Sequence, residues 1–550
     1  MTSDKRPTKM PSGRLAAFLA AFVVLLFCPV PDGMRPEAMR LIAVTFLMAA
    51  LWVSQVIPLA ATSLLPLALF PLLGIQNAKT VSAAFINDNV FLFLGGFFIA
   101  LSIERWGLHR RIALRIVAAI GSQPKRLVLG FIVATGGLSM WISNTATTLM
   151  MLPIALALLQ TLEQESGEEG KALATRLAVP ILLGIAYSAS VGGMTTIVGT
   201  PTNTVAASIY AESTTPPPEN ESSQSRADDS ADSTDGRTQI KPATDATVSR
   251  EISVAQWMLA CMPIGVLYLL MIWLVLTWRL PRATEHDEGL RTVLRERLNQ
   301  LGRMTFAERR VLILFVLTAL LWLFRRPLDI GSYRLIPGWS QLIPAWFGQL
   351  GVSDSIDPAG FINDSTVAIL VAVLLFFIPS GTKTEDGKSV PLMNWETAVK
   401  LPWDIVLLFG GGFALAKAYG VTGLAEWLGG ELEGLLTGQP AWIIVAGVCL
   451  VMIFLTEVTS NVATVNTLLP TLITMSVALG LNPLMMMVPA TLATSCAFML
   501  PIATPPNAIV FGSGRIQVQD MVRYGFLLNL IGVPLLTVAT WLLIRPVFGI

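Results

Sequence analysis

The sequence predicts an all-α integral membrane protein, and three observations lead to that prediction. Hydrophobic residues make up 53% and charged residues only 13% of the 550 residues, whereas soluble domains have roughly 45–50% and about 25%. Apolar runs long enough to cross a bilayer recur from end to end, and we expect about 11 transmembrane helices. The two halves of the chain also carry the same short motifs in the same order. These repeats predict two re-entrant hairpins and two broken helices.

The apolar runs provide the expected crossings in chain order. The first follows a cluster of basic residues, as a signal peptide would, but no small-residue cleavage site precedes Pro29. We therefore expect a retained first helix. The principal runs cover residues 15–30, 38–57, 90–103, 258–278, 311–324, 366–379, 442–455 and 526–544.

Basic residues collect in alternate loops and so predict the orientation. They are concentrated in residues 105–126, 279–310 and 383–400. Because Lys and Arg favour cytoplasmic loops, we expect these segments and the N-terminus to be cytoplasmic, with the protein in the plasma (inner) membrane. Residues 105–126 are also expected to form an amphipathic surface helix. The charge distribution does not indicate a nucleic-acid partner, and the four scattered cysteines predict neither disulfides nor a zinc site.

Three motifs of the first half return in the second half. Because the first set enters from the cytoplasmic side and the second from the outer side, we interpret the copies as inverted repeats, which are typical of transporters with a site where the repeats meet. Unrelated apolar regions of similar small-residue composition are the alternative. The pairs are residues 93–97 with 409–413, 143–147 with 460–464, and 199–203 with 503–507.

The middle motif places polar residues in the centre of an apolar stretch. Ser143, Asn144 and Thr145 would lie at the tip of a hairpin of two short helices, where non-helical backbone is tolerated only if it is buried in protein or lines a wet cavity. In a single copy, these side chains could simply bond to their own helix or pack against a neighbour. Recurrence of the pattern at Ser460 and Asn461 favours a binding site.

The last motif supplies helix breaks. Glycines and Pro201 interrupt one apolar segment, and Pro501, Pro505 and Pro506 interrupt the other. A split helix offers free N–H groups to an anion at one end and free carbonyls to a cation at the other. A packing kink is the alternative for any single proline.

The motif regions contain no Lys, Arg or His that could neutralise an anion. Burying a carboxylate costs roughly several kcal/mol, and a hydrogen bond to a charged group returns only about 1.5–3 kcal/mol. We therefore expect co-bound cations, and clusters of neutral oxygens suit Na⁺ better than a transition metal. Glu457 is an intramembrane carboxylate that could couple protons or act as a structural acid bonded to nearby groups.

At these residues the chain resembles the divalent anion/sodium symporter family, which includes sodium-coupled dicarboxylate and citrate carriers. The most specific elements are residues 143–145, 456–461 and 503–507, and Val462 departs from the second Ser-Asn-Thr pattern. The resemblance implies a homodimer whose transport domain slides past a scaffold domain in an elevator motion. It also implies one sodium site at Ser139, Ser143, Asn144 and Gly199, a second at Thr456, Thr459, Asn461 and Ala503, and substrate contacts from Asn144, Thr145, Thr200, Ser460, Asn461 and Pro505.

The expected domains follow from the repeats and this resemblance. Scaffold helices would occupy residues 1–126 and 311–430, and the transport domain residues 127–211, 251–279 and 431–550. A disordered acidic extracytoplasmic insert is expected at 212–250 and a basic cytoplasmic connector at 280–310.

The sequence thus predicts a transporter and not an enzyme, importing C4 dicarboxylates such as succinate, malate or fumarate with sodium ions. A proton-coupled carrier, a sodium-independent dicarboxylate exchanger, and a carrier of citrate or sulfate are the alternatives. The expected partners are the small-molecule substrate, the lipid bilayer and a second copy of the chain.

Overall fold

The computed structural model describes most of the chain. Of the acidic insert predicted at 212–250, residues 215–250 lie outside the described residues, while residues 212–214 end a helix and so belong to the folded part. The described ranges are 12–86, 88–165, 167–214, 252–281, 287–330, 333–336, 338–342, 362–424, 426–428, 430–431 and 438–550.

The described residues form mostly helices. In the first half these are α1 (Ser12–Leu26), α2 (Pro36–Ser54), α3 (Leu59–Ser63), α4 (Leu65–Leu72), α5 (Ala78–Ala84), α6 (Asp88–Arg105), α7 (Leu108–Ile120), α8 (Pro124–Ser139), α9 (Asn144–Glu165), α10 (Gly167–Gly193) and α11 (Pro201–Thr214). The rest are α12 (Val254–Thr277), α13 (Asp287–Gln300), α14 (Phe306–Leu323), α17 (Asp364–Phe377), α18 (Trp395–Ala398), α19 (Trp403–Val421), α21 (Ala441–Thr456), α22 (Asn461–Ala478), α23 (Leu484–Thr494), α24 (Pro505–Phe511), α25 (Val518–Ala539) and α26 (Arg545–Phe548).

Two short antiparallel hairpins interrupt the helices, a feature that the sequence did not predict. Strand β1 (Leu328–Ile330) pairs with β2 (Tyr333–Ile336), and β3 (Pro379–Lys383) pairs with β4 (Ser389–Pro391). Short 3-10 and π segments cover Trp339–Leu342 and Thr540–Ile544.

Within the described residues, seven helices are long and apolar enough to cross a membrane, or up to eight if a bent pair counts as one span. The bent pair consists of α6 and α7, whose axes differ in direction by 73°. Helix α7 lies within residues 105–126, the segment where the sequence predicts a surface helix. Five further apolar helices are shorter. The count of eleven crossings stays a prediction.

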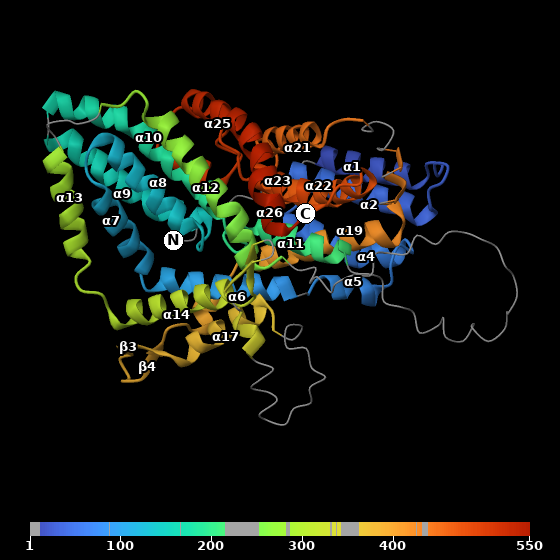
Figure 1. Ribbon diagram of the computed structural model, residues 1–550, viewed down its shortest axis with the longest axis horizontal. Coiled ribbons are helices and arrows are strands. Elements are labelled where there is room, and N and C mark those ends of the chain that lie inside the picture. The colour runs from blue at the N-terminus through green and yellow to red at the C-terminus, as the bar shows by residue number, and fades with distance from the viewer. Residues whose placement is uncertain are drawn as a thin grey trace, which may run out of the picture.

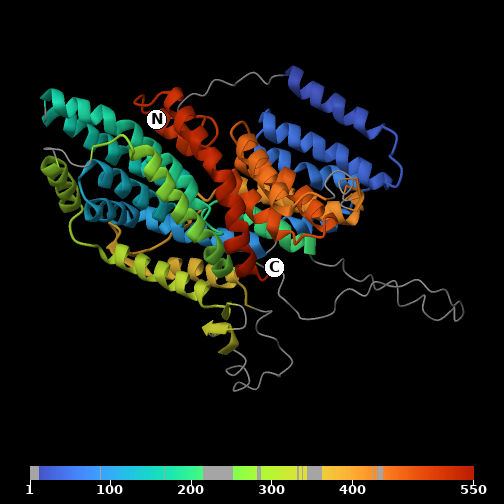
Figure 2. The same ribbon diagram turned by 45° about the horizontal axis from the view of Figure 1, so that its top comes forward.

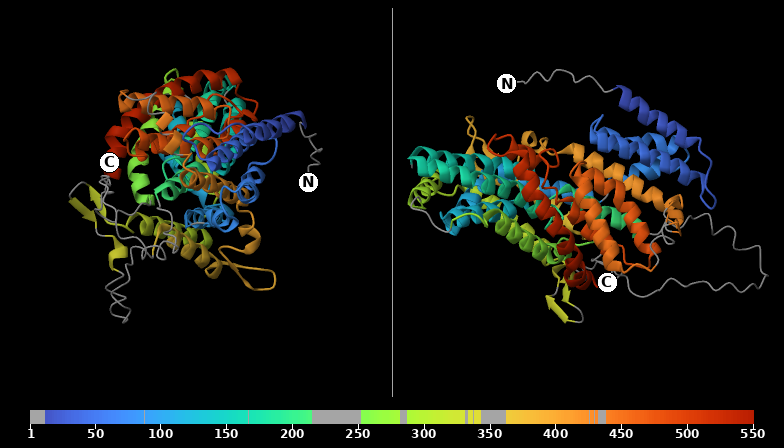
Figure 3. Two further views of the ribbon diagram at one scale, coloured as in Figure 1. Left: turned by 90° about the vertical axis from the view of Figure 1, so that its right-hand side faces the viewer. Right: turned by 90° about the horizontal axis from the view of Figure 1, so that it is seen from above.

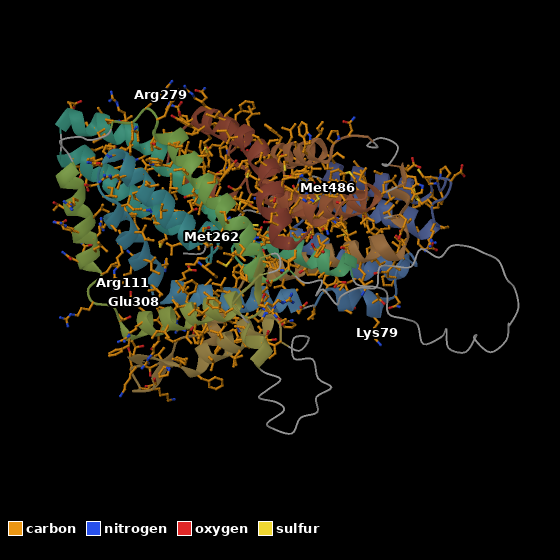
Figure 4. The ribbon with its side chains drawn as sticks, in the orientation of Figure 1. Lys79, Arg111, Met262, Arg279, Glu308 and Met486 are labelled. Atoms are coloured by element: carbon orange, nitrogen blue, oxygen red, sulfur yellow. The ribbon has the colours of Figure 1, made fainter. Side chains whose placement is uncertain are left out.

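The faces of these helices are themselves apolar. On α12, Leu259, Met262, Val266, Leu270 and Leu274 are all exposed and recur every three or four residues, so they form one stripe. Figure 4 labels Met262 within this helix. A contiguous exposed apolar face is rare on soluble monomers. In this chain it agrees with a surface that faces lipid.

The two hairpin regions lie on opposite sides of the molecule. Helices α8, α9 and α10 gather on the left in Figure 1, whereas α21, α22 and α23 gather on the right beside α1 and α2, with α25 between the two groups. Figure 2 and the right-hand view of Figure 3 keep this division, and in them α1 lies at the periphery. The groups interlock, because α11 packs against α19 and α22 of the second half, while α24 packs against α9 and α10 of the first.

A buried ion pair fixes α7 to the first turn of α14. The Arg111 Nε lies 2.9 Å from the Glu308 Oε1, and the guanidinium also donates to the carbonyls of Leu301 and Gly302 at 2.9 and 2.8 Å. Figure 4 labels Arg111 and Glu308 side by side. Glu308 additionally belongs to the capping box that begins α14. The pair therefore connects the bent helix to the basic connector.

Candidate functional site

The tip of the first hairpin lies between the end of α8 and the start of α9. The Ser139 Oγ lies 2.7 Å from the Asn144 Oδ1 and 2.7 Å from the carbonyl oxygen of Ala189. A hydroxyl has one proton and can donate to only one of these acceptors at a time. Three neutral oxygens therefore share one proton, which is an arrangement that a hard cation can complete. Unlike the short helix expected after this tip, α9 extends for 22 residues, with Pro153 inside it.

The tip of the second hairpin, between α21 and α22, repeats this arrangement. The Thr456 Oγ1 lies 2.7 Å from the Asn461 Oδ1 and 3.2 Å from the carbonyl oxygen of Thr494. The spacing of five residues between hydroxyl and asparagine is the same as in the first tip. Both copies thus hold an oxygen cluster of the same composition.

The two tips differ at two hydroxyl positions. The Thr459 Oγ1 bonds to the Thr464 Oγ1 at 2.6 Å in the second tip, whereas the corresponding residue of the first tip is Ile142. The counterpart of Thr464 is Thr147, whose buried hydroxyl finds no partner among the described residues. Thr145 of the first tip in turn corresponds to Val462 of the second, so each tip has one hydroxyl that the other lacks.

Each broken helix is stabilised by an asparagine that follows the break. The Asn203 Nδ2 donates to the carbonyls of Gly193 and Thr196, at 3.1 and 2.7 Å. The Asn507 Nδ2 donates to the carbonyls ten and seven residues before it, at 2.9 and 3.0 Å. These bonds satisfy carbonyls that the break removes from the helical ladder. The equal spacing supports a specific break in both halves over a simple kink.

Glycine is required where the first break meets the first tip. A methyl group on Gly193 would overlap the side-chain oxygen of Asn144, and one on Gly199 would lie 2.9 Å from the carbonyl oxygen of Met140. The Thr196 hydroxyl connects the two segments with hydrogen bonds. It donates to the Met140 carbonyl at 2.5 Å and accepts from the Gly199 N–H at 2.9 Å. The tip and the break therefore form one rigid unit.

Glu457 connects the second tip to the second break. Its carboxylate accepts from the backbone N–H groups of Phe498, Met499 and Leu500 at 2.7, 2.9 and 3.1 Å, and from the Asn529 Nδ2 at 2.7 Å. The residue is 3% exposed. The sequence left two roles open for Glu457, proton coupling and a structural acid. Four donors directed at one carboxylate are the geometry expected of the structural acid.

Both tips and both breaks line one cavity of about 870 Å³, within the range of roughly 300–1,000 Å³ typical of small-molecule sites. Ten of the twelve residues suggested by the family resemblance lie in its wall. Ser139 and Thr456 are fully buried behind Asn144 and Asn461 and reach the cavity only through them. The ten are Ser143, Asn144, Thr145, Gly199, Thr200, Thr459, Ser460, Asn461, Ala503 and Pro505.

Other parts of the cavity wall come from residues that the sequence analysis did not connect with the site. Gln55 follows α2 with a left-handed backbone (φ 50°), Glu104 lies at the end of α6, and Lys400 precedes α19. Lys400 and Glu104 are the charged residues among the described lining residues, and their charges cancel. In the sequence, Lys400 only ends the basic segment 383–400, and neither a repeat nor a motif connects it with the hairpin tips.

Two family models match the chain. The one described as the sodium:sulfate symporter transmembrane region matches residues 240–549, and the one described as a citrate transporter matches residues 49–225.

Curated relatives match over nearly the full length. A protein of Staphylococcus saprophyticus named sodium-dependent dicarboxylate transporter SdcS is 36% identical over 534 residues, covering 96% of this chain and 90% of that protein. A protein of the same name from Staphylococcus aureus strain RF122 is 35% identical over 557 residues, covering 100% of this chain and 95% of the relative.

Among solved structures, the chain is similar to MtrF of Neisseria gonorrhoeae, described as illuminating a class of antimetabolite efflux pumps. The TM-score is 0.50 with 12% identity, over 96% of this chain and 95% of that one. At this identity the similarity concerns the fold alone, which is that of a membrane transporter.

Proposed function

Because the chain belongs to the divalent anion/sodium symporters, the family of the sodium:sulfate symporter region, we propose that it is a secondary active transporter that imports a C4 dicarboxylate such as succinate, malate or fumarate together with sodium ions. The observation that carries this proposal is the pair of matching oxygen clusters at the two hairpin tips, which meet two helix breaks in one cavity. The relatives named sodium-dependent dicarboxylate transporters support the same substrate and ion.

Sodium is needed because the cavity cannot neutralise a dianion with its own charges. Lys400 contributes one positive charge and Glu104 one negative charge to the described lining, so the net contribution is zero. A buried carboxylate loses roughly several kcal/mol of hydration, and neutral donors recover only about 1.5–3 kcal/mol each. Cations that enter with the substrate supply the missing attraction. The uptake of each ion therefore favours that of the other.

The proposed sites follow the two halves of the repeat. One sodium ion would be held by Ser139, Ser143, Asn144 and Gly199. The second would be held by Thr456, Thr459, Asn461 and Ala503. Between them, the dicarboxylate would contact the side chains and backbone N–H groups of Asn144, Thr145, Thr200, Ser460 and Asn461, beside Pro505. Each asparagine would then contact a cation through its oxygen and the substrate through its nitrogen.

Alternating access in this proposal is an elevator motion within a homodimer in the plasma membrane, with the N-terminus cytoplasmic. The transport domain comprises residues 127–211, 251–279 and 431–550, which contain both hairpins and both breaks. The scaffold comprises the helices of residues 1–126 and 311–430. The presence of Lys400 in the cavity wall supports an opening toward the basic, cytoplasmic side.

Citrate is a second candidate substrate, since the citrate transporter model matches residues 49–225, which include the first hairpin and the first break. Purified protein in proteoliposomes tests both candidates. We expect labelled succinate to accumulate under an inward sodium gradient, with unlabelled malate and fumarate as competitors. Accumulation of citrate but not succinate would change the substrate, and accumulation driven by a proton gradient without sodium would refute the symport.

A further inference from the structure

The glycines of two repeat motifs, residues 93–97 of α6 and 409–413 of α19, do not line the cavity described above. The two copies contact each other through their first phenylalanines, because the rings of Phe93 and Phe409 pack edge to face with centroids 4.8 Å apart. Both rings are fully buried. The glycines that follow are therefore placed in corresponding positions of the two halves.

Most of these glycines allow close packing within the scaffold. A methyl group on Gly95 would overlap Ala368 of α17, one on Gly410 would overlap the ring of Phe85, and one on Gly411 would lie 2.7 Å from the Ser63 Cβ. All of these partners lie in segments assigned to the scaffold.

The last glycine of each motif instead faces the transport domain. A methyl group on Gly96 would lie 3.1 Å from the Val198 Cγ1, in the first helix break. A methyl group on Gly412 would overlap the side-chain oxygen of Asn466 on α22. The two glycines both come three residues after the phenylalanine of their motif. Both halves of the repeat thus place a residue without a side chain where the two domains touch.

The Asn466 side chain is arranged to leave this contact free of specific bonds. Its Nδ2 donates to the Val462 carbonyl of its own helix at 3.1 Å, whereas its buried Oδ1 has no partner among the described residues. The oxygen lies against the Gly412 backbone, where only a weak Cα–H contact is available. A smooth contact with no interlocking side chain and no strong hydrogen bond resists sliding little.

We infer that Gly96 and Gly412 form a pair of sliding contacts between scaffold and transport domain, and that their missing side chains set the rate of translocation. This inference rests on the elevator motion of the proposed function. It assigns a role to the last glycine of each motif that differs from the packing role of Gly410 and Gly411.

Gly412→Ala tests the inference, with Gly420→Ala as the matched control. Gly420 lies on the same helix, and a methyl group there meets nothing within 4 Å. Alanine favours a helix more than glycine does, so any loss at Gly412 comes from the contact with Asn466. We expect the maximal rate of sodium-driven succinate uptake to fall about tenfold. Sodium-dependent succinate binding in detergent should change by less than about threefold, because the cavity is untouched.

The double variant Gly412→Ala/Asn466→Ala removes the overlapping oxygen and should restore the rate to that of Asn466→Ala alone. Uptake by Gly412→Ala equal to that of Gly420→Ala would overturn the inference. So would a parallel loss of uptake and binding that Asn466→Ala fails to rescue, because that result indicates a purely structural glycine. If the wild type carries citrate or sulfate instead, the substrate assignment fails, and the same comparison is made with that anion.

Discussion

Asn144→Ala removes the side chain that both proposed ligands of the first tip share. The amide is half-buried, its oxygen lies 2.7 Å from the Ser139 Oγ, and it faces the cavity. In the proposed complex the oxygen contacts a sodium ion and the nitrogen contacts a carboxylate. If each interaction with a charged group contributes about 1.5–3 kcal/mol, their joint loss is about 3–6 kcal/mol. This corresponds to a loss of binding of roughly a hundredfold to ten-thousandfold.

The folded protein should survive this change, because among the described residues the Asn144 side chain makes one hydrogen bond, a neutral one with the Ser139 hydroxyl that is worth about 1 kcal/mol. The assay is labelled succinate uptake in proteoliposomes, with insertion and thermal unfolding measured in parallel. Asn299→Ala, an exposed asparagine of α13, serves as the control. By the repeat, Asn461→Ala should behave like Asn144→Ala. Uptake within about threefold of wild type in either variant would refute the shared-ligand argument.

Three further changes test other parts of the account. Thr456→Val removes the hydroxyl 2.7 Å from the Asn461 Oδ1, and it should raise the sodium concentration for half-maximal uptake about tenfold while succinate affinity at saturating sodium stays near wild type; an unchanged sodium dependence would exclude this hydroxyl. Glu457→Gln turns an NH₂ group toward backbone donors and should destabilise the protein by about 1–3 kcal/mol, whereas lost uptake at an unchanged unfolding temperature would favour the proton-coupling role. Arg111→Met leaves the Glu308 carboxylate buried without its cation and should cost about 3–5 kcal/mol of stability, measured by denaturant unfolding in detergent; an unchanged midpoint would show that the pair contributes nothing.

The hairpin tips and helix breaks could be predicted because their signals are local. A Ser-Asn pair in an apolar run and a proline after glycines each disrupt a helix at a definable residue, and α9, α11, α22 and α24 begin where these signals stand. Recurrence in the second half distinguished these breaks from ordinary kinks.

Features that depend on tertiary packing could not be predicted in the same way. Lys400, Glu104 and Gln55 come from three separate helix ends that meet only in the folded protein. The hydrogen bonds between Glu457 and the backbone of residues 498–500 also join distant segments. The family resemblance implies that Ser139 and Thr456 are sodium ligands. Only the structure shows that these two residues lie behind the asparagines of the hairpin tips. Their effect on the cavity is consequently exerted through Asn144 and Asn461.

The end points of helices and the presence of short strands were the hardest features to predict. Helix α11 runs to Thr214, into the segment where the composition predicted disorder, because a short polar end can continue a helix whose first turns are buried. The two β-hairpins were missed because strands such as β1 and β4 have only three residues, too few to show the alternation of apolar and polar residues that identifies a strand.

Mutual stabilisation of sodium and dicarboxylate at one site is the claim on which the account depends. Isothermal titration of the detergent-purified protein with succinate, at increasing sodium and with potassium keeping the ionic strength constant, measures it directly. The account predicts that the succinate dissociation constant falls steeply as sodium rises, and that sodium affinity rises reciprocally when succinate is present. Succinate binding of equal strength in sodium and in potassium alone would contradict it.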